Sequence, residues 1–268
     1  MIQFTYVGQQ FAFTDVDSDV HISSIMKDTN TFYEADVLEQ LRDRLGLQAH
    51  EGMAIDVGAY VGTHSVYFAR VCGFPKVIAF EPDPNSFEVL QRNLHLNGID
   101  NRTVCVNKAV GRKRGICKLV RPYQPNGGSS RVSYTSANGI AEIQVTRLDD
   151  ELGEQGEKGV RLLKIDVEGF ELEVVRGARQ MIDQHRPLLS VEIHSAGHLI
   201  ELLWILRNQK YLIVDCLGAS PTYILEASPA KPFAQRLASN ALWVLRSLIP
   251  ESLSALRWYC YRTAKAVI

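Results

Sequence analysis

Apolar positions change their spacing along the chain, from the alternation typical of strands to the spacing typical of helices. From residue 53 the order is an apolar run MAIDVG, a helical run THSVYFARVCG, an apolar run KVIAFEPD and a helical run PNSFEVLQRNLHLNG. Asp83 and Pro84 suit the N-cap and first position of the second helix, and Asn97-Gly98 suits its end. This pattern predicts repeated strand-helix units.

The same alternation continues in the second half of the chain. We expect strands in RTVCVNKAVG, AEIQVTRL, VRLLKIDVEG and PLLSVEIHS, and one helix in FELEVVRGARQMIDQHR. A helix in HLIELLWILRNQ follows, with late strands in YLIVDCL and ALWVLR. Strands that alternate with helices of this length predict an α/β fold, in which a doubly wound, mostly parallel, Rossmann-like sheet carries helices on both faces.

The two ends of the chain depart from this repeat. Residues 2–25 alternate apolar and polar positions around GQQ and DVDSD, so we expect a short strand pair that forms an appendage outside the core. ADVLEQLRDRLGL predicts a helix that stops at Gly46. We therefore divide the chain into a β appendage (1–30), a main domain (31–248) and a C-terminal helical segment (249–268).

The C-terminal segment is expected to be an amphipathic helix, with Arg257, Arg262 and Lys265 on its polar face. Docking of its apolar face on the parent domain or on a partner subunit is the simpler interpretation. A peripheral membrane-surface contact stays open as an alternative, as does a homo-oligomer.

Composition limits the class of protein. The chain has 268 residues, of which 46% are hydrophobic, and its 29 basic and 30 acidic residues give a net charge of −1, which argues against a nucleic-acid partner. Five cysteines without a Cys-x-x-Cys pair indicate neither a disulfide framework nor a zinc site. No secretory signal or transmembrane run is present, so we expect a soluble, cytoplasmic protein.

The stretch AIDVGAYVGTHS predicts a tight strand-to-helix turn. Gly58 and Gly62 lack the third glycine of the pyrophosphate-binding G-x-G-x-x-G fingerprint. Asp56 is expected to face the same crevice, and Glu81 closes the next strand, where an acidic residue accepts hydrogen bonds from ribose hydroxyls. These residues favour a nucleoside ligand without a pyrophosphate; a purely structural turn is the alternative.

Taken in order and spacing, these motifs resemble the FkbM-type family of S-adenosylmethionine-dependent methyltransferases. The resemblance extends over residues 31–194 and rests on TFYEADVL, AIDVGAYVGTHSVYFA, AFEPDPNSFEVLQRNLHLN, VNKAVG, NGGSS, TRLDDEL, LLKIDVEGFELEVVRGA and LLSVEIHS. One departure is Tyr60, which stands where the family commonly has asparagine.

The resemblance implies S-adenosyl-L-methionine as cofactor and S-adenosyl-L-homocysteine as product. It implies that the methionine and ribose parts lie along Asp56, Gly58, Tyr60 and Gly62, that Glu81 holds the ribose, and that Pro82 and Asn107 lie near the adenine. Tyr33 and Glu34 match the segment that would close over the cofactor or acceptor, with an exposed helix start as the alternative. The NGGSS loop would suit a lid equally well as an ordinary surface loop.

Two strand ends carry the candidate chemistry. Because side chains alternate along a strand, Lys164, Asp166 and Glu168 are expected on one side, and likewise Glu192 and His194. His194 is the first candidate for the base that takes the proton of an acceptor hydroxyl, since its ordinary pKa of about 6.5 suits this task.

The other polar side chains have several possible roles. Asp166 is the second candidate base and also a cofactor contact, Glu192 and Glu168 would orient the acceptor, and Lys164 would contact it or pair with a carboxylate. The three carboxylates and His194 could also collect a divalent metal, although no spacing demands one.

The resemblance implies an O-methyltransferase that acts on a hydroxyl of a sugar, a glycan or a glycosylated or polyketide-like metabolite. A catalytically inactive cofactor-binding scaffold is the alternative from another class. An NAD-dependent sugar oxidoreductase is disfavoured by the missing third glycine. A membrane-surface assembly protein working through the C-terminal helix is the remaining possibility.

Overall fold

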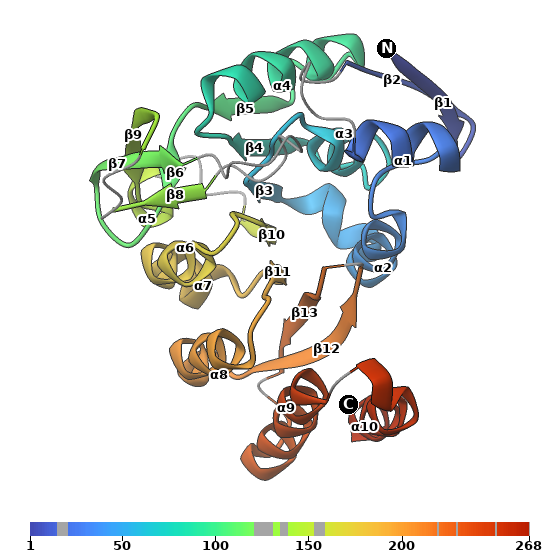
Figure 1. Ribbon diagram of the computed structural model, residues 1–268, viewed down its shortest axis with the longest axis vertical. Helices are drawn as coiled ribbons and strands as arrows, with labels where there is room; N and C mark the ends of the chain where they lie inside the picture. The colour runs from blue at the N-terminus through green and yellow to red at the C-terminus, as the bar shows by residue number, and fades with distance from the viewer. Residues whose placement is uncertain are drawn as a thin grey trace.

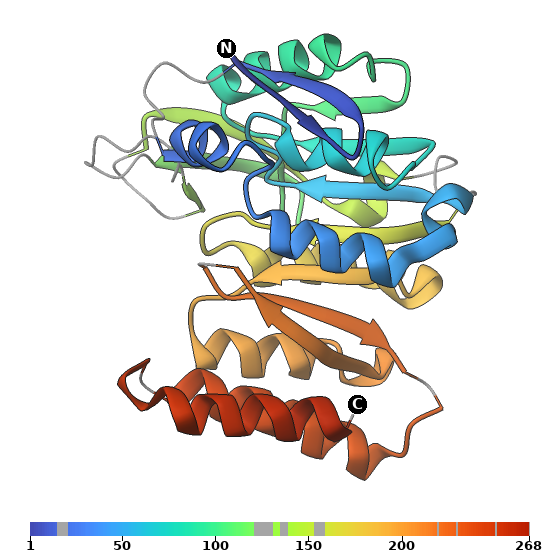
Figure 2. The same cartoon turned by 90° about the vertical axis from the view of Figure 1, so that its right-hand side faces the viewer.

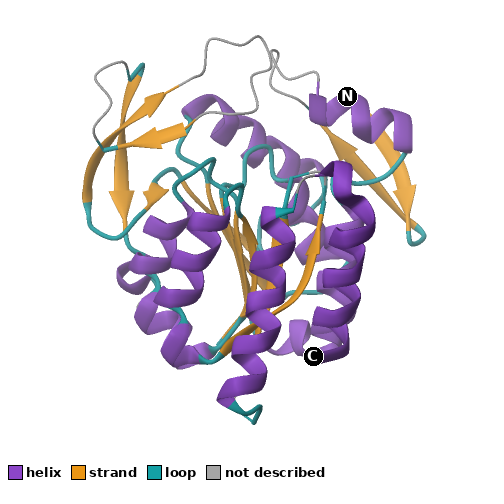
Figure 3. Cartoon of the chain, turned by 60° about the horizontal axis from the view of Figure 1, so that its bottom comes forward, coloured by secondary structure: helices purple, strands orange, loops and turns teal. Residues whose placement is uncertain are grey.

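A computed structural model describes residues 1–14, 21–120, 131–134, 139–152, 159–218, 220–228, 230–249 and 251–267. Its centre is a seven-stranded sheet with helices on both faces (Figure 1, Figure 3). The sheet has the order β12-β13-β11-β10-β3-β4-β5, and its strands are Met53–Val57 (β3), Lys76–Phe80 (β4), Thr103–Val106 (β5), Val160–Ile165 (β10), Leu188–Glu192 (β11), Tyr211–Leu217 (β12) and Thr222–Ala227 (β13). The predicted α/β fold with a mostly parallel sheet is confirmed.

The order of the strands determines where a ligand binds. From β3 the chain runs outward through β4 and β5, and then returns to place β10 and β11 on the other side of β3. All four of these pairings are parallel, whereas β13 pairs antiparallel with both β11 and β12. The reversal between β3 and β10 is a topological switch point, where open α/β sheets bind ligands at the carboxyl ends of the strands.

Helices cover this sheet because its strands are apolar on both faces; all five residues of β3 and of β11 are buried. The expected helix in FELEVVRGARQMIDQHR is divided at Ala178 into two short helices. The α-helices between the N-terminal hairpin region and the C-terminal helix pair are Ala35–Leu45 (α2), Thr63–Arg70 (α3), Pro84–Leu96 (α4), Leu148–Glu151 (α5), Glu171–Gly177 (α6), Arg179–His185 (α7) and Ala196–Ile205 (α8).

A smaller sheet lies beside the main one. It has the order β6-β9-β7-β8, and only the β6–β9 pair is parallel. Its strands are Ala109–Val110 (β6), Gly115–Val120 (β7), Arg131–Ser133 (β8) and Ala141–Thr146 (β9). The NGGSS segment lies outside the described residues.

The N-terminal residues form the expected strand pair, Ile2–Tyr6 (β1) and Gln9–Phe13 (β2), but residues 21–29 form a helix, α1 (His21–Thr29). The expectation that the pair lies outside the core is wrong. Phe4 and Phe11 are at most 4% exposed and pack edge-on against Phe32 in one of the two large hydrophobic clusters. The alternating side chains give the hairpin one apolar face, which must be covered to be stable.

The C-terminal part differs from the prediction in two ways. ALWVLR is not a strand; it lies inside the long helix α9 (Phe233–Leu248), which packs beside α10 (Ser254–Val267) (Figure 2). The last strand is β13, over TYILEA, which the pattern analysis missed. Trp243 of α9 is fully buried and contacts Tyr261 of α10 edge-on, so α10 docks on its own domain. None of the described helices is long and apolar enough to cross a bilayer.

Candidate active site

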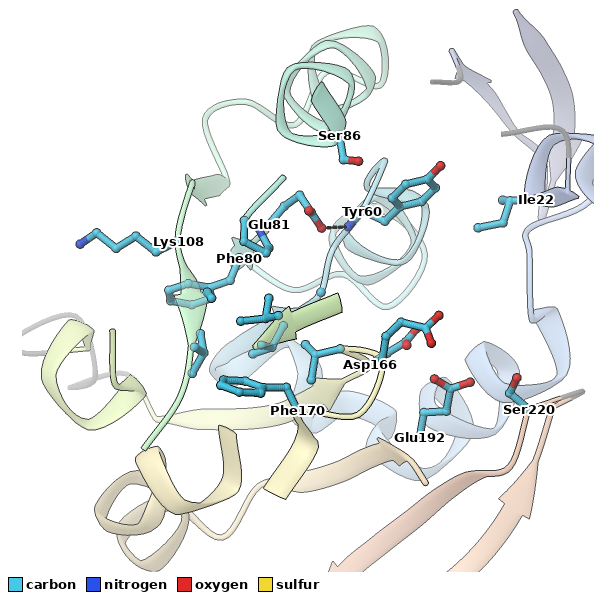
Figure 4. Close-up of a pocket in the computed structure, with 18 of the residues that line it drawn as sticks. Ile22, Tyr60, Phe80, Glu81, Ser86, Lys108, Asp166, Phe170, Glu192 and Ser220 are labelled. Atoms are coloured by element: carbon cyan, nitrogen blue, oxygen red, sulfur yellow. Dashed lines mark hydrogen bonds between the residues drawn. The ribbon is translucent and has the colours of Figure 1, made fainter. Parts of the chain in front are cut away.

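A cavity of about 370 Å³ opens at the carboxyl ends of β3, β4, β10 and β11 (Figure 4). Nine of the predicted site residues line it, although they belong to motifs far apart in the chain. They are Tyr33, Glu34, Gly58, Tyr60, Glu81, Pro82, Asp166, Glu168 and Glu192.

The turn after β3 forms the floor of this cavity. Its first two amide groups, of Gly58 and Ala59, both donate to the carbonyl oxygen of Phe80, at 3.0 and 2.9 Å, and so fix the turn to the end of β4. Gly58 has a φ of 78°, and a Cβ atom there would lie 1.8 Å from the carbonyl oxygen of Asp166. Only glycine allows β3 and the end of β10 to lie this close together.

Glu81 follows β4 and turns its carboxylate toward the glycine turn (Figure 4). Its oxygens accept hydrogen bonds from the backbone N–H groups of Tyr60 and Asp83, both at 2.8 Å. Burial raises the pKa of Glu81 to about 7, and these two hydrogen bonds oppose that rise. Asn107 does not line the cavity; its amide donates to the carbonyl oxygens of Glu81 and Pro82 and supports this segment from behind.

The position of Asp56 differs from the prediction. Its side chain is fully buried and does not line the cavity, so the expectation that its charge faces the crevice is wrong. One carboxylate oxygen accepts a hydrogen bond from the Ser65 hydroxyl at 2.7 Å, and the other lies 3.2 Å from the Lys164 ammonium. The reason is register: Asp56 pairs with Lys164 across adjacent buried strands, so the two charges neutralise each other inside the sheet.

Lys164 lies beneath the cavity rather than on its wall. Its ammonium donates to the carbonyl oxygen of Gly58 at 2.8 Å and lies 3.5 Å from the Asp166 carboxylate. Burial disfavours the charged form, but the charges of Asp56 and Asp166 outweigh burial and hold the pKa of Lys164 above its ordinary value. This cation therefore connects the glycine turn with the carboxylate that faces the cavity.

Asp166 and Glu192 come from the ends of adjacent parallel strands, and their carboxyl groups face one another (Figure 4). Burial opposes ionisation of Asp166, but the charge of Lys164 outweighs it, so the pKa of Asp166 lies below its ordinary value. Burial and the nearby charge of Asp166 raise the pKa of Glu192 well above its ordinary value. These opposite shifts leave the pair with one proton at neutral pH.

Glu34 places a third carboxyl group at the same wall. It is the N-cap residue of α2, and its side chain is 11% exposed. Burial, and then the charge of Asp166, raise the pKa of Glu34 to about 7. His64 lies behind it, with Nε2 3.6 Å from a Glu34 oxygen; because burial lowers the pKa of His64 to about 4, this contact is not an ion pair at neutral pH.

Three residues on the cavity wall have left-handed backbone conformations, although none is glycine. Glu34, Tyr60 and Glu168 have φ values of 53°, 49° and 53°. This conformation costs about 1–2 kcal/mol for a residue with a Cβ atom, and such strain concentrates at functional sites.

His194 and Gly62 are the remaining predicted residues that the structure keeps away from the cavity. β11 ends at Glu192, so the alternation expected to carry His194 into the crevice stops; its side chain is 52% exposed, and Nε2 lies 3.5 Å from a Glu192 oxygen. Gly62 is the N-cap residue of α3 and packs against Leu90. Among the described residues, no three Asp, Glu, His or Cys side chains are arranged to hold a metal ion.

The cavity also contains residues that the sequence motifs did not predict. Ser86 could have been found, since it lies in the first turn of the helix after Glu81-Pro82; Phe170 follows the KIDVEG motif directly. Six others lie inside the quoted motifs without having been singled out, and only Ile22, Val132 and Ser220 gave no local signal. These additional lining residues are Ile22, Val57, Phe80, Ser86, Lys108, Ala109, Val110, Val132, Val167, Phe170 and Ser220.

The fold and the cavity at its switch point define a Rossmann-like α/β protein with a small-molecule site. Comparison with known proteins identifies its family. A family model for the methyltransferase FkbM domain matches residues 56–213. The chain therefore belongs to the FkbM methyltransferase family, as the sequence motifs predicted. The methyltransferase domain of METTL16, at 17% identity and a TM-score of 0.50 over 78% of each chain, has the same Rossmann-like fold.

Two of the similar curated proteins have names that state a chemistry. The hexuronic acid methyltransferase AglP of Haloferax volcanii is 31% identical over 142 residues, which cover 52% of this chain and 55% of AglP. The 2-O-methyltransferase NoeI of Sinorhizobium fredii is 22% identical over 157 residues, covering 52% of this chain and 63% of NoeI. The matches thus span less than two thirds of either relative.

Proposed function

We propose that this chain is an S-adenosylmethionine-dependent O-methyltransferase that methylates a hydroxyl of a sugar, a glycan or a glycosylated or polyketide-like metabolite. Family membership supports methyl transfer, the name of NoeI favours a hydroxyl oxygen as the methyl acceptor, and the name of AglP, which states a hexuronic acid, favours a sugar. The observation that carries the proposal is one cavity that contains Glu81, a carboxylate hydrogen-bonded to the glycine turn, and the carboxyl pair of Asp166 and Glu192.

The residues of the cavity fit the cofactor. Each oxygen of Glu81 accepts one backbone N–H group and keeps a second lone pair, which suits the two hydroxyls of a ribose. Apolar walls from Phe80, Val110 and Phe170 suit an adenine ring. The glycine turn brings backbone close to the ligand without a side chain in the way. A volume of about 370 Å³ lies within the usual range of small-molecule sites.

When bound, the cofactor supplies an electrophilic methyl group on a sulfonium. The chain must then align a hydroxyl oxygen with that group and take up its proton. Asp166 is ionised and lines the cavity, so it accepts the hydrogen bond of the acceptor hydroxyl. In this proposal Glu192 is the protonated partner: it donates a hydrogen bond to Asp166 and keeps the pair at a single negative charge until Asp166 takes up the acceptor's proton. We therefore assign the role of base to Asp166 rather than to His194.

His194 has a different role in this proposal. Its ring lies on the solvent side of Glu192, half exposed. A proton that reaches the carboxyl pair can pass through Glu192 to His194 and on to water. His194 thus restores the protonation state of the pair between turnovers and does not touch the acceptor.

Charge at the acceptor end favours a neutral polyhydroxyl acceptor. Glu34, Asp166, Glu168 and Glu192 line this part of the cavity. Lys108 is the only cation among the described lining residues, and it is paired with Glu151 at 2.8 Å. An acceptor carboxylate would therefore meet like charge with no free cation, at a cost that grows in a partly buried site.

Calorimetric titration of the purified chain with S-adenosylhomocysteine, with NAD as the control, tests the cofactor. Micromolar binding of S-adenosylhomocysteine, without binding of NAD, supports the proposal. Binding of NAD without binding of S-adenosylhomocysteine would overturn it. Transfer of labelled methyl from S-adenosylmethionine to neutral glycosides then tests the acceptor class, with the matching uronates as the control. Cofactor binding without transfer to any hydroxylated acceptor would favour an inactive scaffold.

A further inference from the structure

Exposed apolar side chains are concentrated at the C-terminal end of the fold. Among the described residues, 17 large hydrophobic side chains are exposed, and ten of them belong to α8, α9, α10 and the short helix Glu251–Leu253 before α10. We call these ten the C-terminal apolar surface: Ile200, Trp204, Phe233, Leu237, Leu245, Leu248, Leu253, Leu256, Trp258 and Tyr259. Such a concentration on a folded domain marks an interaction site.

The faces of α9 explain how this surface arises. Ser239 and Trp243 are fully buried and point to the domain. Leu237, Leu245 and Leu248 follow helical spacing on the opposite side and are 52–61% exposed. The helix is therefore apolar on its outer face as well as on its inner face. A helix whose outer face contacts only water normally has polar residues there.

The other helix, α10, is firmly docked and still exposes large side chains. Cys260 and Ala264 are buried, and Lys265 forms an ion pair of 2.6 Å with Asp215 of β12. On the outer side, Trp258 and Tyr259 are 58% and 64% exposed. Because α9 and α10 lie side by side, both outer faces belong to the same end of the molecule (Figure 1, Figure 2).

Charge identifies what covers this surface. Residues 230–268 contain six basic residues and one acidic residue, whereas the rest of the chain contains 23 basic and 29 acidic residues. Both exposed tryptophans carry an arginine over the ring: Arg207 at 4.4 Å from Trp204 and Arg262 at 4.8 Å from Trp258. Indole rings next to cations suit the interface of a bilayer, where the ring meets acyl chains and the cation meets phosphate.

We propose that the C-terminal apolar surface binds peripherally to a membrane that carries anionic lipids. A second copy of the chain fits less well, because a two-fold contact would bring two basic surfaces together. The proposal goes beyond the methylation chemistry and does not depend on it. It adds that this end of the molecule lies on the surface of a bilayer.

Co-sedimentation of the full chain with vesicles tests this. We expect binding to vesicles that contain phosphatidylglycerol, weak binding to phosphatidylcholine alone, and loss of binding at high salt. The double variant Leu248→Gln/Trp258→Gln should lower the partition coefficient at least about tenfold, and Arg262→Glu by about fivefold or more. Leu47→Gln and Ile116→Gln, at exposed apolar positions of other elements, are the matched controls and should bind like the wild type.

Light scattering of the same proteins without lipid measures their oligomeric state and so tests the competing occupant, a second copy of the chain. Failure of the wild type to bind phosphatidylglycerol vesicles would overturn the proposal. If light scattering then shows a dimer that the double variant dissociates, the surface binds a second copy of the chain instead. Equal losses in the Leu47→Gln and Ile116→Gln controls would overturn it too, because binding would then not be located at this surface. Should the double variant fold poorly, the lipid and salt dependence of the wild type still decides.

Discussion

The ammonium group of Lys164 donates a hydrogen bond to the carbonyl oxygen of Gly58 across 2.8 Å. This bond joins the end of β10 to the turn that follows β3, and the same ammonium group lies between Asp56 and Asp166. One buried cation thus holds the glycine turn and the proposed base in a fixed relation. Variants in and around this network should change the free energy of unfolding, ligand binding and turnover to different extents, and each of these can be measured separately.

Lys164→Met should lower the free energy of unfolding by about 3–5 kcal/mol, because it leaves the buried carboxylate of Asp56 without its charge partner. Urea denaturation measures this. Lys118→Met is the control, since it removes an ion pair with Glu142 on the surface and should cost about 0–1 kcal/mol. Equal losses in the two variants would show that the buried network contributes nothing special.

Gly58→Ala should cost about 3 kcal/mol or more and should abolish tight binding of S-adenosylhomocysteine. The added methyl group would collide with the carbonyl oxygen of Asp166, and the backbone is left-handed, so the turn must open. Gly98→Ala is the matched control: its φ is 66°, but nothing lies within 4 Å of its Cβ position, so only the strain of about 1 kcal/mol remains. Thermal unfolding and calorimetry compare the two; similar effects would contradict the close approach of β3 and β10.

Local motifs predicted the parts of the site that depend on a short stretch of chain. The glycine turn and Glu81 were found because a strand, a turn and a terminal acid follow one another in sequence. The direction of Asp56 could not be found this way, because it is set by its register with Lys164 across two strands that lie 108 positions apart in the sequence. Ser220 reaches the cavity from the loop before β13, and no local pattern indicates that β13 returns to the edge of the sheet beside β11.

The fold was predicted best where the apolar period was sustained. The run ALWVLR was assigned to a strand, but it is too short to distinguish a strand from part of a helix, and it contains a single β-branched residue. TYILEA, with threonine and isoleucine beside tyrosine, has the stronger β propensity and is the true last strand. The hairpin at the N-terminus was found, but its burial depends on Phe32 and Tyr67, which come from later elements.

Glu34→Gln should stabilise the cofactor-free protein at pH 8 by about 1–3 kcal/mol. In the folded state the pKa of Glu34 is raised to about 7, mainly by burial, whereas the unfolded chain has the ordinary value of 4.5. The native state therefore holds a proton that the unfolded chain releases between pH 4.5 and 7, and this residue makes stability fall as the pH rises through that window.

Urea denaturation at pH 5 and pH 8 measures the effect, and the variant should lose less stability between the two values than the wild type. Glu142→Gln, on the exposed surface, should keep the wild-type difference. An unchanged pH dependence in Glu34→Gln would mean that Glu34 ionises without cost in the folded state.

Asp166→Asn should lower kcat by a factor on the order of 10² to 10⁴, because asparagine cannot take the proton of an acceptor hydroxyl. Calorimetry should still detect binding of S-adenosylhomocysteine, which separates loss of the base from loss of the site. His194→Ala is the comparison, because the ring lies outside the cavity, 3.5 Å from Glu192. It should lower kcat less than about tenfold, and added imidazole should restore part of the loss if His194 carries the proton to water. A large loss in His194→Ala together with an active Asp166→Asn would return the role of base to the histidine, and would require the chain after β11 to turn inward when the acceptor binds.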